Sequence, residues 1–172
     1  MKTIKMFSVV FFTTLLSTNA IAQSSKTIVE NAIGSKDHTT LVAAIKAAGL
    51  VETLSGKGPF TVFAPTNDAF AKLPKGTVET LLKPENLKTL QAVLTYHVVA
   101  GNLNSAAVVK TIKAGNGSAT LTTVQGGKLV ASIDGKNVIL TDEKGNKSTI
   151  TAVDITSSNG VIHVIDSVVL PK

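Results

Sequence analysis

A change in the spacing of apolar residues at about residue 118 constrains the fold of this chain more than any other feature. Before it, apolar residues recur at helical spacing, as they do over residues 37–49. From Ser118 onward the spacing is two, and turn pairs such as Gly126-Gly127 and Asp134-Gly135 separate short segments. Helices in the first part and antiparallel strands in the second predict an α+β fold, in which the helices pack against a sheet wedge or sandwich. The pattern gives no support to a parallel, doubly wound sheet.

The first 22 residues have the pattern of a cleavable signal peptide. Lys2 and Lys5 precede a short apolar run over 6–16, and Ala20-Ile21-Ala22 forms a small-x-small cleavage site. The run is about half the roughly 20 residues that span a bilayer, so an uncleaved tether is the weaker alternative. We therefore expect export through the general secretory route, to a periplasm or outside the cell, with a mature chain that begins at Gln23.

The length and composition of the mature chain predict one domain over residues 27–171, after a frayed start at 23–26. It contains no cysteine, so it has no disulfide, no thiol nucleophile and no thiolate metal site. It contains no arginine either, and its lysines are scattered singly. Although the precursor carries a formal charge of +6, this distribution argues against a nucleic-acid interface.

Helix signals occupy most of the first half. Helices are predicted at 27–34, 37–49, 68–73, 76–82, 84–95 and 104–112. Asp37 is the expected N-cap of the second helix and Thr66 or Asn67 that of the third. The expected buried positions are Ile28, Ala32 and Ile33 in the first helix, Leu41, Ala44, Ile45 and Ala48 in the second, and Leu87, Leu90 and Leu94 in the fifth.

Strand signals include two segments in the first half as well. Extended segments are predicted at 60–64, 96–99, 121–123, 129–133, 138–140, 149–151, 161–165 and 167–170. The last two are apolar on both faces, which is typical of central strands that are covered on both sides.

Three ordered segments carry a family resemblance. Residues 60–70 read FTVFAPTNDAF, Tyr96-His97 lies in LTYHVV, and residues 159–166 read NGVIHVID, followed by SVVLP up to Pro171. In this order and spacing the chain closely resembles the beta-Ig-H3/fasciclin family, in its single-domain, secreted bacterial form. The resemblance implies a compact α+β domain used in cell adhesion and in matrix or partner binding. It implies neither catalysis nor a cofactor.

The motif residues also have structural interpretations of their own. Asp68 can accept backbone N–H bonds at a helix start, Asn159-Gly160 is a tight turn, and His163 is more simply a hydrogen-bonded core histidine than a ligand. The predicted structural motif residues are Thr66, Asn67, Asp68, Phe70, Asn159, Gly160, His163 and Asp166.

Four residues are candidates for partner binding. The resemblance assigns Tyr96-His97 to an adhesion surface, whereas the residues themselves favour a structural role, with one side chain buried because neighbours on a strand face opposite sides. Asp154-Ile155 falls where related animal domains carry an adhesion segment, although Thr151, Ala152 and Val153 depart from that pattern. The alternative is that Asp154 is a solvated residue at a strand end.

The sequence contains no recognisable catalytic or metal-binding pattern. No Gly-x-Ser-x-Gly elbow occurs, and His163 and Asp166 would face opposite sides of a strand. His38, His97 and His163 lack metal-ligand spacing. We therefore expect a non-enzymatic, monomeric domain that binds a cell-surface or matrix protein or a polysaccharide, weakly because it lacks Trp and Arg. The alternative is a carrier of a small, lipid-like apolar ligand, with a pocket between the helices and the sheet.

Overall fold

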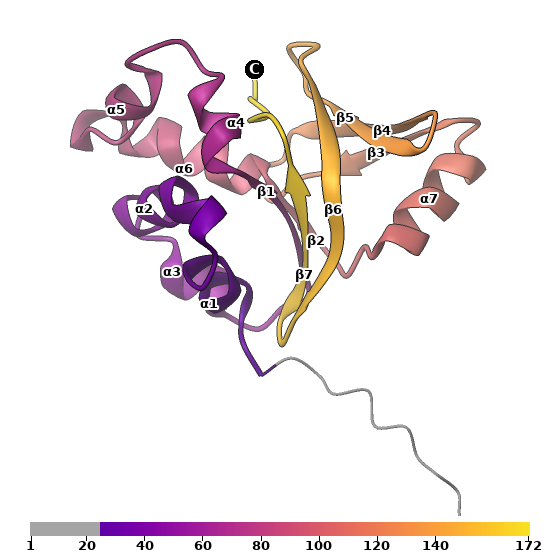
Figure 1. Cartoon of the computed structure of the whole chain (residues 1–172), viewed down its shortest axis with the longest axis horizontal. Coiled ribbons are helices and arrows are strands. Elements are labelled where there is room, and N and C mark those ends of the chain that lie inside the picture. Colours follow the sequence, from indigo (N-terminus) through magenta and orange to yellow (C-terminus); the bar gives the residue numbers. More distant parts are fainter. Residues whose placement is uncertain (1–24) are drawn as a thin grey trace, which may run out of the picture.

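Residues 25–172 are the part of the chain that the computed structural model describes, so the predicted signal segment 1–22 lies outside it. Within these residues all helices precede Ser118, and five of the seven strands, β3 to β7, follow the last helix (Figure 1). The helical elements are α1 (Ile28–Ile33), η1 (Lys36–His38), α2 (Thr39–Ala47), α3 (Val51–Ser55), α4 (Asn67–Ala71), α5 (Thr77–Leu81), η2 (Pro84–Asn86), α6 (Leu87–Tyr96) and α7 (Ser105–Ala114). The strands are β1 (Phe60–Pro65), β2 (Val98–Ala100), β3 (Ser118–Thr122), β4 (Lys128–Asp134), β5 (Asn137–Thr141), β6 (Lys147–Ser157) and β7 (Gly160–Ile165). No helix among these has the length and apolar character needed to cross a bilayer.

The strands form one mixed sheet in the order β2-β1-β7-β6-β5-β4-β3. All neighbouring pairs are antiparallel except β1 and β7, which are parallel from Phe60–Gly160 to Pro65–Ile165. A bridge between Val99 and Thr123 joins the two edge strands, so the sheet is nearly closed. The predicted α+β class is therefore confirmed.

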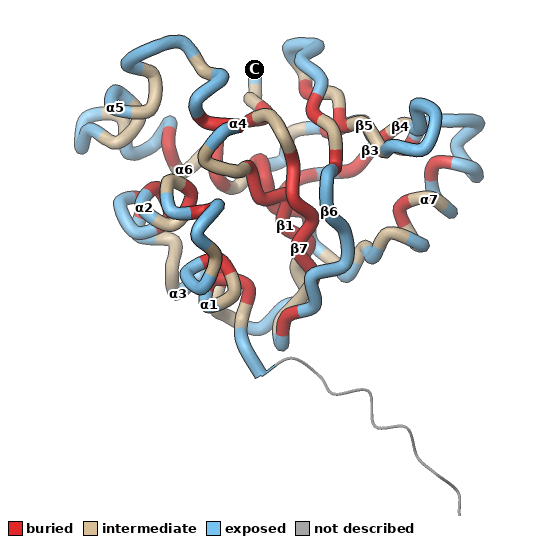
Figure 2. The backbone as a smooth tube through the Cα atoms, viewed as in Figure 1, coloured by how far each residue is buried: buried red, intermediate tan, exposed pale blue. Residues whose placement is uncertain are grey.

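Strands β1 and β7 are buried along almost their whole length (Figure 2). They separate two apolar clusters, which explains why both of their faces are apolar. Along β1, Val62 and Ala64 face the cluster formed with α1–α4 and α6, while Phe63 faces the other cluster. In the second cluster Phe63 packs with Val108 and Ile112 of α7 and with the inner residues of β3–β5. Helices α1–α6 thus lie on one side of β1 and β7, and α7 lies against β3 and β4 on the other (Figure 1).

Local signals predicted most helix starts correctly. The Thr66 side chain accepts a hydrogen bond from the Ala69 N–H at 3.2 Å and caps α4, and the Asn104 side chain caps α7. Asp37 is not a cap, because it lies inside η1. Asp68 is exposed, and Thr66 rather than Asp68 accepts the capping bond.

Several predicted details were wrong. In α1, Val29 is buried and Ile33 is 52% exposed, because the helix packs on α2 and β7 through Ile28, Val29 and Ala32. In α6, Val93 replaces Leu87 on the buried face. Helix α3 was not predicted at all.

Two predicted extended segments also differ. Residues 96 and 97 end α6 instead of starting a strand. Residues 167–170 form no strand, because the N–H groups of Val169 and Leu170 donate to the side chains of His97 and Asp142.

Candidate functional site

Tyr96, the first candidate binding residue, lies entirely inside the molecule. Its side chain is 0% exposed, at the end of α6. Its hydroxyl donates to the Lys128 carbonyl at 2.6 Å and accepts from the Glu143 N–H at 3.2 Å. Burial raises the pKa of Tyr96. The ring therefore links α6 to the strand β4 and to the turn that follows β5.

His97 is buried as well, which corrects the expectation that only one of the two would be. Its Nδ1 donates to the Val93 carbonyl at 2.8 Å, and its Nε2 accepts from the Val169 N–H at 3.2 Å. These partners fix one neutral tautomer. Burial lowers the pKa of His97 to about 4. The imidazole holds the C-terminal segment against α6, so neither residue of the pair offers atoms to a partner in this structure.

His163 is a core histidine with hydrogen bonds at both ring nitrogens. Its Nε2 donates to the Leu103 carbonyl at 2.7 Å, and its Nδ1 accepts from the Asp154 N–H at 3.4 Å. The ring stacks on Phe63 with centroids 5.7 Å apart. Because both nitrogens are engaged with backbone, His163 is not arranged as a general base.

Asp154 is exposed, as the alternative interpretation expected, but it lies within β6 rather than at a strand end and is held in place from two sides. Its backbone has φ 58°, at an irregular register between β6 and β7. Its carboxylate accepts hydrogen bonds from the N–H and the hydroxyl of Ser105, at the start of α7. Partial burial opposes ionisation, but the two Ser105 bonds and the nearby His163 outweigh it and lower the pKa of Asp154. Sequence reasoning missed Ser105, for which the helix-cap pattern at Asn104 was the only signal.

The residues beside Asp154 are apolar and exposed. Val153 is 47% exposed and Ile155 is 39% exposed. The stretch from Thr151 to Thr156 faces solvent, while β7 on its inner side is buried. We call residues 153–155 the exposed segment. The Asp154 bonds to Ser105 and His163 fix its shape, so the segment presents two apolar side chains on a rigid support.

The first signature block joins helices to one another. Asn67 Oδ1 accepts from the Thr40 N–H at 3.0 Å, and its Nδ2 donates to the Lys36 carbonyl at 2.9 Å. Phe70 is buried in the helical cluster. The block therefore connects α4 to η1 and α2 by side-chain bonds.

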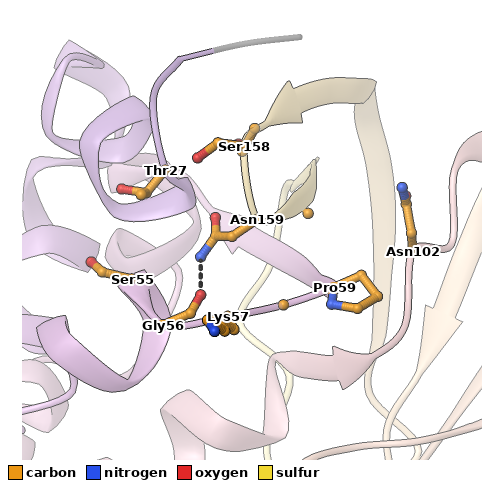
Figure 3. A pocket seen from close by; sticks show the side chains of 11 residues that line it. Thr27, Ser55, Gly56, Lys57, Pro59, Asn102, Ser158 and Asn159 are labelled. Atoms are coloured by element: carbon orange, nitrogen blue, oxygen red, sulfur yellow. Dashed lines mark hydrogen bonds between the residues drawn. The ribbon is translucent and has the colours of Figure 1, made fainter.

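The second signature block joins the sheet to the helices. Asn159 Oδ1 accepts from the Ile28 N–H at 2.9 Å, and its Nδ2 donates to the Leu54 carbonyl at 2.8 Å. The same Nδ2 donates to the Gly56 carbonyl at 3.0 Å, the bond drawn in Figure 3. Gly160 allows close strand approach, since a Cβ there would lie 1.9 Å from the Phe60 carbonyl oxygen.

Asp166, at the end of the same block, ties the sheet to α4. Its carboxylate accepts from the Thr149 N–H at 2.8 Å and from Lys72 Nζ at 3.3 Å. Partial burial opposes ionisation, but these bonds and one from Ser167 lower the pKa of Asp166. The predicted structural residues other than Asp68 are therefore bonded or buried within the fold.

An open polar hollow of about 550 Å³ lies beside Asn159, between the α3–β1 connection and the β6–β7 turn (Figure 3). Ser55, Lys57, Asn102 and Ser158 line it, and within residues 25–172 their side chains make no hydrogen bond or ion pair. Its lining contains hydroxyl and amide groups and a lysine, but no carboxylate. Such a lining suits a hydroxylated or anionic ligand.

Comparison with known proteins agrees with this architecture. The fasciclin domain model matches residues 36–171. A Synechocystis protein, sll1483, is 52% identical over 153 residues, which cover 88% of this chain and 77% of the relative. The pig transforming growth factor-beta-induced protein ig-h3 is 39% identical over 145 residues, covering 84% of this chain but only 19% of that longer protein.

A solved structure supports the fold independently of sequence. The FAS1 domain pair of the insect cell adhesion molecule fasciclin I superposes with a TM-score of 0.75 at 18% identity, covering 86% of this chain and 51% of that one. The family model matches most of the chain and the relatives are 52% and 39% identical to it, so the chain belongs to the fasciclin domain family.

Proposed function

We propose that this protein is an exported, non-enzymatic domain that mediates weak adhesion to a cell-surface or matrix partner. The observation that carries the proposal is the contrast between the buried motif residues and the exposed segment. Tyr96, His97 and His163 are engaged with backbone groups, so they serve the fold. The exposed segment, in contrast, presents Val153 and Ile155 on a strand that Asp154 anchors.

The family association and the composition support the same proposal. The chain belongs to a family associated with adhesion and matrix interactions and generally non-catalytic. Trp and Arg, which dominate tight interfaces, are absent from the chain. We therefore infer an interface that is weak at each contact and gains strength through many copies on one surface.

An attachment assay tests the proposal. Surfaces coated with the protein are expected to retain cells or matrix of the producing strain, and Val153→Ser/Ile155→Ser is expected to reduce retention toward the uncoated level. The matched control is Val124→Ser/Ile133→Ser, because those side chains are 47% and 40% exposed and lie elsewhere. Equal retention by both double variants, with circular dichroism showing intact folds, contradicts a role for the exposed segment.

A polysaccharide is the second candidate partner, and the polar hollow beside Asn159 favours it. Lys57 and Asn102 lie on its rim with no partner among the described residues. Lys57→Ala/Asn102→Ala is expected to weaken binding to an acidic polysaccharide on a glycan array, with Lys136→Ala as a charge-matched control. Unchanged glycan binding in the double variant argues against the hollow as the contact.

The lipid-carrier alternative receives less support. Ligand pockets usually enclose about 300–1,000 Å³. The apolar hollow between the helices and the sheet has a volume of about 160 Å³, which is too small for a lipid chain.

A further inference from the structure

Strand β6 has neighbouring strands on both sides for only part of its length. Its residues Lys147–Thr149 pair with β5. Among the described strands, β7 alone pairs with β6 from Ile150 to Ser157. Residues 151–155, which we call the free edge, are all exposed and lie in the pale blue part of β6 in Figure 2. A strand that is open on one side presents unpaired backbone groups, which are a template for pairing with another chain.

The sequence around the free edge favours such pairing. Residues 149–157 read TITAVDITS, in which most residues are β-branched and neither proline nor glycine occurs. Segments of this composition with little net charge form intermolecular sheets when they lie on an exposed edge. Asp154 is the only charged residue in the stretch. The one charge that opposes pairing therefore lies within the free edge itself.

Asp154 also interrupts the geometry of the free edge. The register with β7 shifts between Ala152, which pairs with Val164, and Ile155, which pairs with Ile162. Asp154 lies in this bulge with φ 58°, a conformation that β-branched residues avoid. A bulge bends its strand, increases the local twist and disrupts the ladder. A second strand therefore cannot follow the free edge in a regular register.

Ser105 holds the bulge in this shape. Its N–H donates to Asp154 Oδ1 at 2.7 Å, and its hydroxyl donates to Asp154 Oδ2. The Asp154 N–H donates to His163 Nδ1 at 3.4 Å. The carboxylate is thereby fixed at the start of α7, while the residue stays exposed. A strand that approached the free edge would have to remove water from this negative charge, which is costly.

We propose that the bulge at Val153-Asp154, held by Ser105, prevents the free edge of β6 from pairing with the free edge of a second copy of this chain. Two identical edges match each other about a two-fold axis, so a second copy is the partner that this edge would otherwise fit. Antiparallel pairing centred on the free edge would also bring two Asp154 carboxylates together, and like charges destabilise a sheet. The bulge therefore leaves the Val153 and Ile155 side chains exposed without leaving a regular strand template. This role does not depend on the adhesive role.

Sedimentation velocity tests the proposal. The wild-type protein is expected to stay monomeric as its concentration is raised. Asp154→Val removes the charge and disfavours the positive φ, so this variant is expected to self-associate. Deletion of Val153 removes the extra residue of the bulge and is expected to have the same effect. Asp134→Val is the matched control, because Asp134 is an exposed aspartate at the end of β4, and it is expected to stay monomeric.

Two further measurements separate edge pairing from misfolding. Hydrogen exchange is expected to show new protection of residues 151–155 in the self-associated variants, with β1 and β7 protected as in wild type. Adding Val153→Lys to Asp154→Val is expected to restore the monomer, since an edge lysine blocks pairing but cannot repair a misfolded core. Monomeric behaviour of both Asp154→Val and the Val153 deletion with intact folds overturns the proposal. Self-association that leaves residues 151–155 unprotected, or that the added lysine does not reverse, also overturns it.

Discussion

At the scale of single residues, polar side chains that bond to distant backbone groups determine how the fold is held together. The Asn159 side chain forms hydrogen bonds with backbone groups in α1 and at the end of α3 that would otherwise lack this partner. His97 does the same for the C-terminal segment. The sequence motifs identified both residues, but their bonding partners are far away in sequence and no local pattern could reveal them.

Replacing Asn159 is expected to be costly. Asn159→Ala removes three hydrogen bonds and leaves the Ile28 N–H and the carbonyls of Leu54 and Gly56 without this partner. We expect the free energy of unfolding to fall by about 2–4 kcal/mol in urea denaturation. Asn102→Ala is the control, because Asn102 is exposed in the same hollow, and its effect should stay within about 0.5 kcal/mol. Similar losses in both variants contradict the role of Asn159.

The stability of the protein is expected to fall between pH 7 and pH 5. Burial lowers the folded-state pKa of His97 to about 4, below the ordinary histidine value of 6.5. In this window the unfolded chain binds a proton that the folded state does not, so acidification favours unfolding. His97 alone contributes a loss of about 2 kcal/mol between these pH values.

The loss is checked by urea denaturation at pH 7 and pH 5. Burial also lowers the pKa of His38, so His38 adds to the loss of stability in this pH window. Asp154 and Asp166, whose pKa values are lowered, lose their contribution to stability only at lower pH. His97→Gln is expected to reduce the difference between pH 7 and pH 5. If the free energy of unfolding changes equally between pH 7 and pH 5 in wild type and in His97→Gln, the assigned role of His97 is contradicted.

At the scale of elements, the close approach of two strand backbones restricts which residues the second signature block can contain. β1 and β7 begin side by side, and a Cβ at Gly160 would lie 1.9 Å from the Phe60 carbonyl oxygen. The same crowding occurs at Gly58, where a Cβ would lie 1.9 Å from the Asn159 carbonyl oxygen. The Asn-Gly pair is thus required by packing between strands as well as by the turn.

Gly160→Ala is expected to destabilise the protein strongly. The added methyl group forces the β1 and β7 backbones apart, and we expect a loss of about 3 kcal/mol by thermal or urea denaturation. Gly34→Ala is the control, because Gly34 has φ −72° and its nearest contact would be an ordinary 3.5 Å. That variant should be as stable as wild type or slightly more stable. A mild effect at Gly160 argues that the strands can separate freely.

At this scale local sequence predicts where elements start better than where they end. The Thr66 and Asn104 caps act within one helical turn, so they were predictable. The boundary between α6 and β2 was predicted only to within two residues, because the strand was expected to start at Tyr96. Instead α6 runs to Tyr96, the His97 side chain bonds back to the Val93 carbonyl, and β2 begins at Val98.

At the scale of the whole molecule, the sheet is nearly closed and has helices on both sides. This arrangement brings motif residues that are distant in sequence into one packed structure. The α+β class followed from the change of apolar spacing at residue 118. The parallel pairing of β1 with β7 did not, since about a hundred residues separate them and nothing local encodes the pairing. For the candidate site, the position of Asp154-Ile155 was predictable, but its anchorage to Ser105 was not.

The central claim is that Tyr96 supports the fold and that the exposed segment makes the contact. Tyr96→Phe tests it most directly, because the variant keeps the ring and removes only the bonds to Lys128 and Glu143. Attachment and urea denaturation are measured on the same preparation. We predict a stability loss of about 1–2 kcal/mol with unchanged attachment of the folded protein. Lost attachment at unchanged stability would contradict the account, because it would make the Tyr96 hydroxyl part of the contact.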